Sequence, residues 1–161
     1  MQERAGARAV VLDTNVALDL LVFDDPAVQP LRAALAGGQW RWWFLPAMRT
    51  ELARVLGYPR IASQLVARGL VPAQVLAAFD AVAHCSAPVP ASTVRCSDPD
   101  DQAFVDLAAA HGALLLSKDH AVLATRRRMA AFGVEVRTLF VTNGPPVKGE
   151  NARLGPLRLA H

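Results

Sequence analysis

The chain has 161 residues, a length typical of one domain, and 53% of them are hydrophobic, which excludes a disordered protein. No apolar run approaches the roughly 20 residues of a membrane span, and the first residues lack the apolar core of a signal peptide, so we expect a soluble, cytoplasmic protein with no membrane contact. The net charge of +3 permits a nucleic-acid partner but does not establish one.

Strands and helices alternate through the first half of the chain. Residues 9–12 (AVVL) form a valine-rich run typical of a strand buried on both faces, and a helix is expected from Asn15 to Val22. Similar patterns predict one more strand and four more helices, over Pro26–Ala36 (helix), Trp40–Leu45 (strand), Pro46–Leu56 (helix), Ile61–Arg68 (helix) and Pro72–Cys85 (helix). Pro88 and Pro90 then mark a loop or an edge strand.

The second half continues the alternation. Asp98 before Pro99 is a favourable helix start, and this helix should end at Gly112. A strand, a helix and a more exposed strand follow, over Ala113–Ser117, Asp119–Phe132 and Val134–Leu139. This alternation predicts a three-layer α/β/α fold with a central parallel sheet. We expect one domain over residues 1–142 and a polar tail over 143–161.

Acidic residues fall at the expected ends of two buried strands. Asp13 ends the first strand, and Asp119 follows the strand over Ala113–Ser117 by two residues. Functional groups in open α/β folds lie at the carboxyl ends of the strands, so these acids can converge if the two strands are neighbours. Asp101 lies in the first turn of the preceding helix, and Glu51 lies in the helix after the tryptophan-rich strand.

Clustered carboxylates repel one another and need a counter-charge to stay ionised. Mg²⁺ or Mn²⁺, which prefer oxygen ligands, would supply that charge and support phosphodiester hydrolysis. Each acid also has a structural alternative. Asp13, Asp98 and Asp119 are suited to capping a helix, Asp101 could interact with a helix dipole, and Glu51 could lie on a solvated surface.

Four segments together resemble the PIN-domain family, and in particular the VapC-type toxins of bacterial toxin–antitoxin pairs. They are Val11–Val16 (VLDTNV), Thr50–Leu56 (TELARVL), Asp98–Phe104 (DPDDQAF) and Leu116–Asp119 (LSKD), and the match spans about residues 9–139. The resemblance implies a PIN-like α/β/α fold that cleaves single-stranded RNA with Mg²⁺ or Mn²⁺. It also implies a cognate antitoxin protein and a homodimer.

The same resemblance assigns roles to individual residues. Asp13 would be the central metal ligand, and Glu51, Asp101 and Asp119 would complete the catalytic metal site, directly or through water. Asn15 and Ser117 would hold carboxylates in place, with Asp98 as a neighbour. Two positions depart from the family pattern, because Lys118 replaces a small residue and Ala121 stands where a further acid is common.

Ala121 motivates an alternative, a PIN-fold module that binds RNA or a protein without cleaving. A second alternative, a phosphoacceptor domain of the receiver type, fits poorly because Lys118 directly precedes Asp119. The tryptophans Trp40, Trp42 and Trp43 could stack on bases, but core or interface packing is the stronger interpretation. Weak candidates for phosphate contact are Arg126, Arg127 and Lys118. We expect Cys85 and Cys96 to be free thiols.

Overall fold

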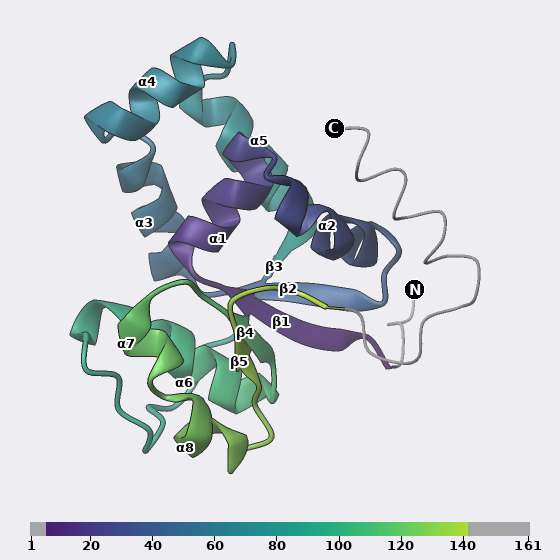
Figure 1. Ribbon diagram of the computed structural model, residues 1–161, viewed down its shortest axis with the longest axis vertical. Coiled ribbons are helices and arrows are strands. Elements are labelled where there is room, and N and C mark those ends of the chain that lie inside the picture. Colours follow the sequence, from purple (N-terminus) through teal and green to yellow (C-terminus); the bar gives the residue numbers. More distant parts are fainter. Residues whose placement is uncertain (1–5, 142–161) are drawn as a thin grey trace.

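Five parallel strands form the centre of residues 6–141, the part of the chain that the computed structural model describes (Figure 1). Their order in the sheet is β3-β2-β1-β4-β5. Their bounds are Arg8–Leu12 (β1), Trp40–Phe44 (β2), Ala83–Cys85 (β3), Leu114–Leu116 (β4) and Val136–Arg137 (β5). The predicted α/β fold with a central parallel sheet is therefore confirmed.

Helices cover both faces of this sheet. In Figure 1 one layer holds α1 (Thr14–Leu18), α2 (Gln29–Ala36), α3 (Pro46–Val55), α4 (Pro59–Ala67) and α5 (Pro72–Val82). The layer on the other face holds α6 (Gln102–His111), α7 (His120–Leu123) and α8 (Arg126–Ala130). Short helical turns of other types precede or follow these helices, over Asp19–Phe23, Pro26–Val28 and Pro99–Asp101. The result is the expected three-layer α/β/α arrangement.

The strand order places β1 and β4 side by side at the middle of the sheet. The chain winds outward from β1 through β2 to β3, and then crosses back to β4 and β5. The direction of winding therefore reverses between β1 and β4, and this is where ligands bind in open α/β sheets. Leu12 pairs with Leu116 in the register, so both strands end at the same level.

Apolar side chains on both faces explain why β1 and β4 form the buried centre. Val10, Val11, Leu115 and Leu116 are almost completely buried. Strands covered by helices on both sides have no solvent-facing positions, so a continuous apolar run is what such a strand requires. The runs over residues 9–12 and 113–117 show this pattern.

The tryptophan-rich strand β2 packs mainly in the core. Trp40 and Trp42 are buried on one face, and Trp42 packs edge-on against Phe79 of α5 with ring centroids 5.0 Å apart. Trp43 points to the other face and stacks on His111 at 4.7 Å. The expectation that these tryptophans belong to the core or an interface rather than to a base-stacking platform is confirmed for Trp40 and Trp42.

Three predicted elements differ from the structure. The helix expected to reach Cys85 ends at Val82, and Ala83–Cys85 form β3 beside β2. The single helix expected over Asp119–Phe132 is two short helices, since the chain turns between α7 and α8. The last strand is limited to Val136–Arg137, because the residues that follow have left the edge of β4.

Within the described residues, no single helix is long and apolar enough to cross a membrane, although the pair α4 and α5, bent by 88°, has the required length and composition together. The loop around Pro88 and Pro90 contains no strand. The predicted tail over residues 143–161 lies outside the described part of the chain.

Candidate functional site

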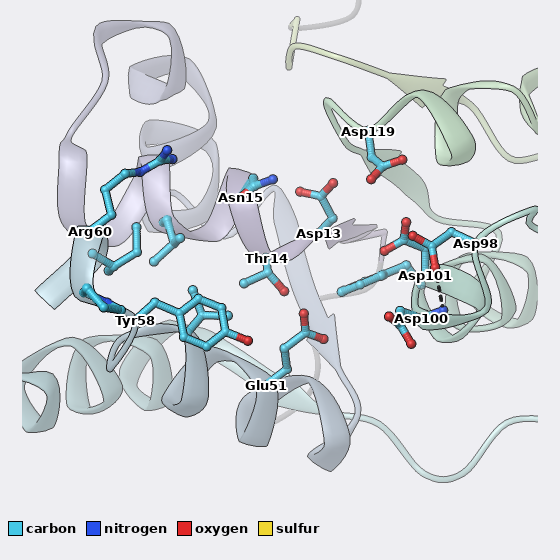
Figure 2. Close-up of a pocket in the computed structure, with 15 residues that line it drawn as sticks. Asp13, Thr14, Asn15, Glu51, Tyr58, Arg60, Asp98, Asp100, Asp101 and Asp119 are labelled. Atoms are coloured by element: carbon cyan, nitrogen blue, oxygen red, sulfur yellow. Dashed lines mark hydrogen bonds between the residues drawn. The ribbon is translucent and has the colours of Figure 1, made fainter.

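A pocket of about 670 Å³ opens at the carboxyl ends of β1 and β4 (Figure 2). All four acids predicted to form the site line it, although they come from four separate segments of the chain. The acidic lining consists of Asp13, Glu51, Asp98, Asp100, Asp101 and Asp119. Six carboxylates around one space require positive charge from a bound cation or from bound protons.

Asp13 lies at the floor of this pocket, directly after β1, and is only 4% exposed. One carboxylate oxygen accepts a hydrogen bond of 3.0 Å from the backbone N–H of Val16, so Asp13 also caps α1. The other oxygen accepts a hydrogen bond from the hydroxyl of Ser117. Burial raises the pKa of Asp13 above its usual value, and these two hydrogen bonds offset part of that rise.

Ser117 connects two of the acids. It is fully buried at the end of β4, and its hydroxyl oxygen accepts a 3.0 Å hydrogen bond from the backbone N–H of Asp119 while donating to Asp13. The contact predicted from the resemblance, in which Ser117 holds a carboxylate, is present. The resemblance assigned the same role to Asn15, but that side chain is exposed and shows no hydrogen bond to any described carboxylate.

Asp98, Asp101 and Asp119 form the tightest group of acids. One carboxylate oxygen from each lies within 4.8 Å of the others, and all three side chains are partly buried. Asp98 caps the turn that begins at Pro99, and Asp119 caps α7 by accepting a 2.8 Å hydrogen bond from the N–H of Ala121. Since each carboxylate has two oxygens, capping leaves one oxygen available for a ligand.

Asp101 is the member of this group whose pKa is raised. Its pKa is raised to about 7, chiefly by burial and then by the charges of Asp119, Asp98 and Asp13. Its Oδ2 atom is buried and has no hydrogen-bond partner among the described residues. A buried carboxylate oxygen without a partner is unfavourable unless a proton or a cation binds there. The three-carboxylate group therefore has the donor chemistry that a hard divalent cation prefers.

Glu51 occupies a different part of the pocket. It extends from α3 on the side away from Asp98 and Asp101, and it does not belong to the three-acid group. Asp100 is exposed beside Asp98 at the rim. The four predicted acids thus share one pocket, but Asp98, named only as a neighbour, lies closer to Asp101 and Asp119 than Glu51 does.

The opposite wall contains two residues that the sequence reasoning missed, Tyr58 and Arg60. They flank Pro59, which begins α4. A tyrosine and an arginine around a helix start carry no recognisable motif, and only the packing of α4 shows that they face the acids. A useful signal would have been their position in the turn directly after the helix of Glu51.

The basic residues predicted as weak RNA contacts have other partners or lie outside the pocket. Lys118 forms an ion pair with Asp19 at 2.5 Å. The Arg126 side chain donates a 3.0 Å hydrogen bond to the carbonyl of Val136 and so fastens α8 to β5. Arg127 is exposed on α8. Ala121, where a further acid was noted as absent, is partly buried and packs against the core.

Comparison with known proteins gives one result that bears on these observations. A family model described as the PIN domain matches residues 9–121, which include every acid of the pocket. No curated protein and no solved structure matches the chain.

Proposed function

The chain belongs to the PIN-domain family, and on this basis we propose that it is an endoribonuclease that cleaves single-stranded RNA with Mg²⁺ or Mn²⁺. PIN domains are generally metal-dependent nucleases, and the acidic pocket is compatible with that chemistry. The observation that best supports the proposal is the group formed by Asp98, Asp101 and Asp119, in which one buried carboxylate oxygen has no described partner.

Asp101, Asp119 and Asp98 would hold the cation, with Asp13 beside them at the floor of the pocket. When bound, such a cation activates a water molecule and stabilises the charge that develops on the phosphodiester. Ser117 would keep Asp13 ionised and correctly oriented, because its hydroxyl hydrogen bond favours the charged form. Glu51 would bind or orient the substrate, directly or through water, from the far side of the pocket.

RNA as the substrate is supported by the basic balance of the chain and by the four sequence segments that resemble the VapC-type toxins. The test is cleavage of a fluorescent, unstructured RNA by the purified chain with Mn²⁺, Mg²⁺ or EDTA. Asp13→Asn should abolish cleavage, and Glu135→Gln, an equivalent change at an exposed acid outside the acidic pocket, should preserve it. Equal cleavage in EDTA, or by Asp13→Asn, would contradict the proposal.

We further propose that the protein is the toxin of a toxin–antitoxin pair, acts as a homodimer and is bound by a cognate antitoxin. Induced expression in a bacterial host should then arrest growth, and Asp13→Asn should remove the arrest. Light scattering at micromolar concentration should give twice the mass of one chain. Active nuclease without growth arrest would reject the toxin role alone, and a monomer would reject the homodimer.

A PIN-fold module that binds RNA or protein without cleaving it remains the alternative, and Ala121 is the observation that favours it. The cap that Asp119 forms with the N–H of Ala121 shows that α7 begins normally without a further acid. Under this alternative, RNA would bind to the chain and remain intact with Mn²⁺.

A further inference from the structure

Tyr58 and Arg60 form the wall of the pocket that faces the acidic group, and we call these two residues the Tyr58–Arg60 wall. Pro59 between them occupies the first position of α4, where its fixed backbone angle suits a helix start. Both side chains are exposed, and the Tyr58 ring points toward Glu51 in Figure 2. The wall therefore offers an aromatic face and a cation to anything that enters the pocket.

Arg60 differs from several other basic residues of the chain in having no described ion pair or hydrogen bond for its guanidinium group. Arg32, Arg49 and Lys118 each form an ion pair with an aspartate. Arg60 is also the only basic residue that lines the acidic pocket in the described part of the chain. An arginine without a carboxylate partner, placed opposite six carboxylates, is available to a negatively charged ligand.

A second cavity of about 410 Å³ continues from the acidic pocket. The residues that line both cavities are Asn15, Leu18, Arg60 and Ile61. Beyond them the second cavity is lined by Asp19, Phe23, Gln64 and Lys118. Arg60 is thus one of the residues that line both cavities, and a strand that occupies both would run along it.

We propose that the Tyr58–Arg60 wall binds the nucleotide next to the scissile phosphodiester, with Arg60 binding its phosphate and Tyr58 stacking on its base. The RNA strand then continues into the second cavity. This inference rests on the proposed nuclease function, which it extends to the way in which the substrate is held.

The negative charge of the pocket explains why a phosphate of the RNA strand would need Arg60 in order to bind there. The acidic group repels a polyanion, and a bound cation offsets this repulsion only for the phosphate nearest to it. The neighbouring phosphates along the strand need a cation from the protein, and among the described residues of the pocket Arg60 is the one that provides it. An arginine can also bind phosphate through two parallel hydrogen bonds.

The exposed ring of Tyr58 predicts a single-stranded substrate. A base can stack on an aromatic side chain only when it has left its own stack, as in unpaired RNA. Stacking of this kind tolerates any base, since every base has a flat aromatic face. The wall should therefore favour unpaired RNA over duplex RNA with little preference for base identity at this position.

The test compares Arg60→Ala with Arg54→Ala, which removes the same charge from an exposed position in the last turn of α3 outside both cavities. Arg60→Ala should raise the KM for an unstructured RNA about tenfold, with kcat within about twofold of wild type, and Arg60→Lys should restore part of the loss. The slope of log affinity against log salt should fall by roughly 0.7, the value for one phosphate of a single strand. Arg54→Ala should change none of these quantities.

Tyr58→Ala should raise KM about tenfold for single-stranded RNA, and Tyr58→Phe, which keeps the ring, should recover most of that loss. A duplex of the same sequence should compete poorly with the single strand for the wild-type protein. Tyr58→Ala should reduce this difference in affinity between single-stranded and duplex RNA. Thermal melting of each variant checks that the fold is intact.

Fluorescence anisotropy of the same RNA in EDTA separates failure of this inference from failure of the proposed function. If the wild-type chain does not cleave RNA, the nuclease proposal fails. The Tyr58–Arg60 wall is then tested only through the RNA affinities of the variants. Equal RNA affinity for wild type, Arg60→Ala and Tyr58→Ala would overturn the inference even in an active nuclease. A loss caused equally by Arg54→Ala would also overturn it, because the effect would then come from general charge.

Discussion

The Ser117 hydroxyl donates a hydrogen bond to the Asp13 carboxylate, so the ends of β4 and β1 are joined through side chains as well as through the backbone pairing. The same hydroxyl accepts the N–H of Asp119. One buried oxygen therefore sets the positions of two acids that come from opposite halves of the chain. This arrangement leads to predictions about activity, stability and pH.

Ser117→Ala should lower the cleavage rate about tenfold and destabilise the fold by about 1–2 kcal/mol, because it leaves Asp13 and the N–H of Asp119 without their buried partner. The pKa of Asp13 should rise further, since one of the hydrogen bonds that lowers it is lost. Single-turnover cleavage and urea unfolding measure the two effects. A variant with unchanged rate and unchanged unfolding midpoint would show that the hydroxyl has no such role.

Asp13→Asn should stabilise the metal-free protein at pH 8 while removing cleavage. Burial makes the ionised carboxylate unfavourable in the folded state, and a neutral amide of the same shape avoids that cost. Its oxygen can still cap α1, and its NH2 group can donate to the Ser117 oxygen in place of the hydrogen bond that Asp13 accepts from Ser117. The expected gain is about 1 kcal/mol, or roughly 3 °C in Tm for a domain of this size. Differential scanning calorimetry in EDTA is the measurement, and a lower Tm for the variant would show that the native charge is stabilising.

The contribution of Asp101 to the stability of the metal-free protein should fall as the pH rises from about 4 to about 7. The folded-state pKa of Asp101 is raised to about 7, above the ordinary value of 3.8 that applies when the chain is unfolded, so the folded chain binds the proton more tightly in this range. The stabilisation is complete below the unfolded pKa and is lost as the pH passes through the folded pKa. Asp101→Asn should flatten this part of the profile of Tm against pH in EDTA, and an unchanged slope would count against the assignment.

Added Mn²⁺ should reverse the trend, because the cation competes with the proton on Asp101. The rise in Tm on adding Mn²⁺ should be larger at pH 8 than at pH 6. A shift that does not depend on pH would mean that the ion binds away from Asp101.

Substitution of Asp98 should act mainly on metal binding, whereas substitution of Glu51 should act mainly on the cleavage rate. Asp98→Asn should weaken Mn²⁺ binding about tenfold, because Asp98 belongs to the tight group with Asp101 and Asp119. Glu51→Gln should leave that affinity within about twofold and act mainly on the cleavage rate, since Glu51 lies across the pocket. Isothermal titration with Mn²⁺ and cleavage assays provide the comparison. Equal losses of affinity in both variants would place Glu51 among the ligands.

Much of the fold was predictable because its central strands have a simple pattern. The apolar runs at residues 9–12 and 113–117 could belong only to buried segments, and the acids that follow them identified the edge of the sheet where the pocket lies. β3 was missed because Ala83–Cys85 continue an apolar helix without a break residue, and only pairing with β2 makes them a strand. Its formation depends on a partner distant in sequence, which local patterns do not contain.

The acids that line the pocket were predictable, and their geometry was less so. Helix caps and metal ligands use the same residues, so the sequence could not show that Asp98 and Asp119 serve as caps while one oxygen of each stays close to Asp101. The Tyr58–Arg60 wall carries no motif, and its place opposite the acids depends on how α4 packs.

The strand order also determines when the acidic group can form during synthesis. Asp13 and Glu51 are made before β3, whereas Asp98, Asp101 and Asp119 are made after it, and the two sets meet only when β4 inserts beside β1. A growing chain that has emerged as far as Cys85 carries only two of the six carboxylates of the pocket, Asp13 and Glu51, and cannot assemble the three-acid group. Under the proposed nuclease function, the chain would stay inactive until the segment through Asp119 has been made and β4 has inserted beside β1.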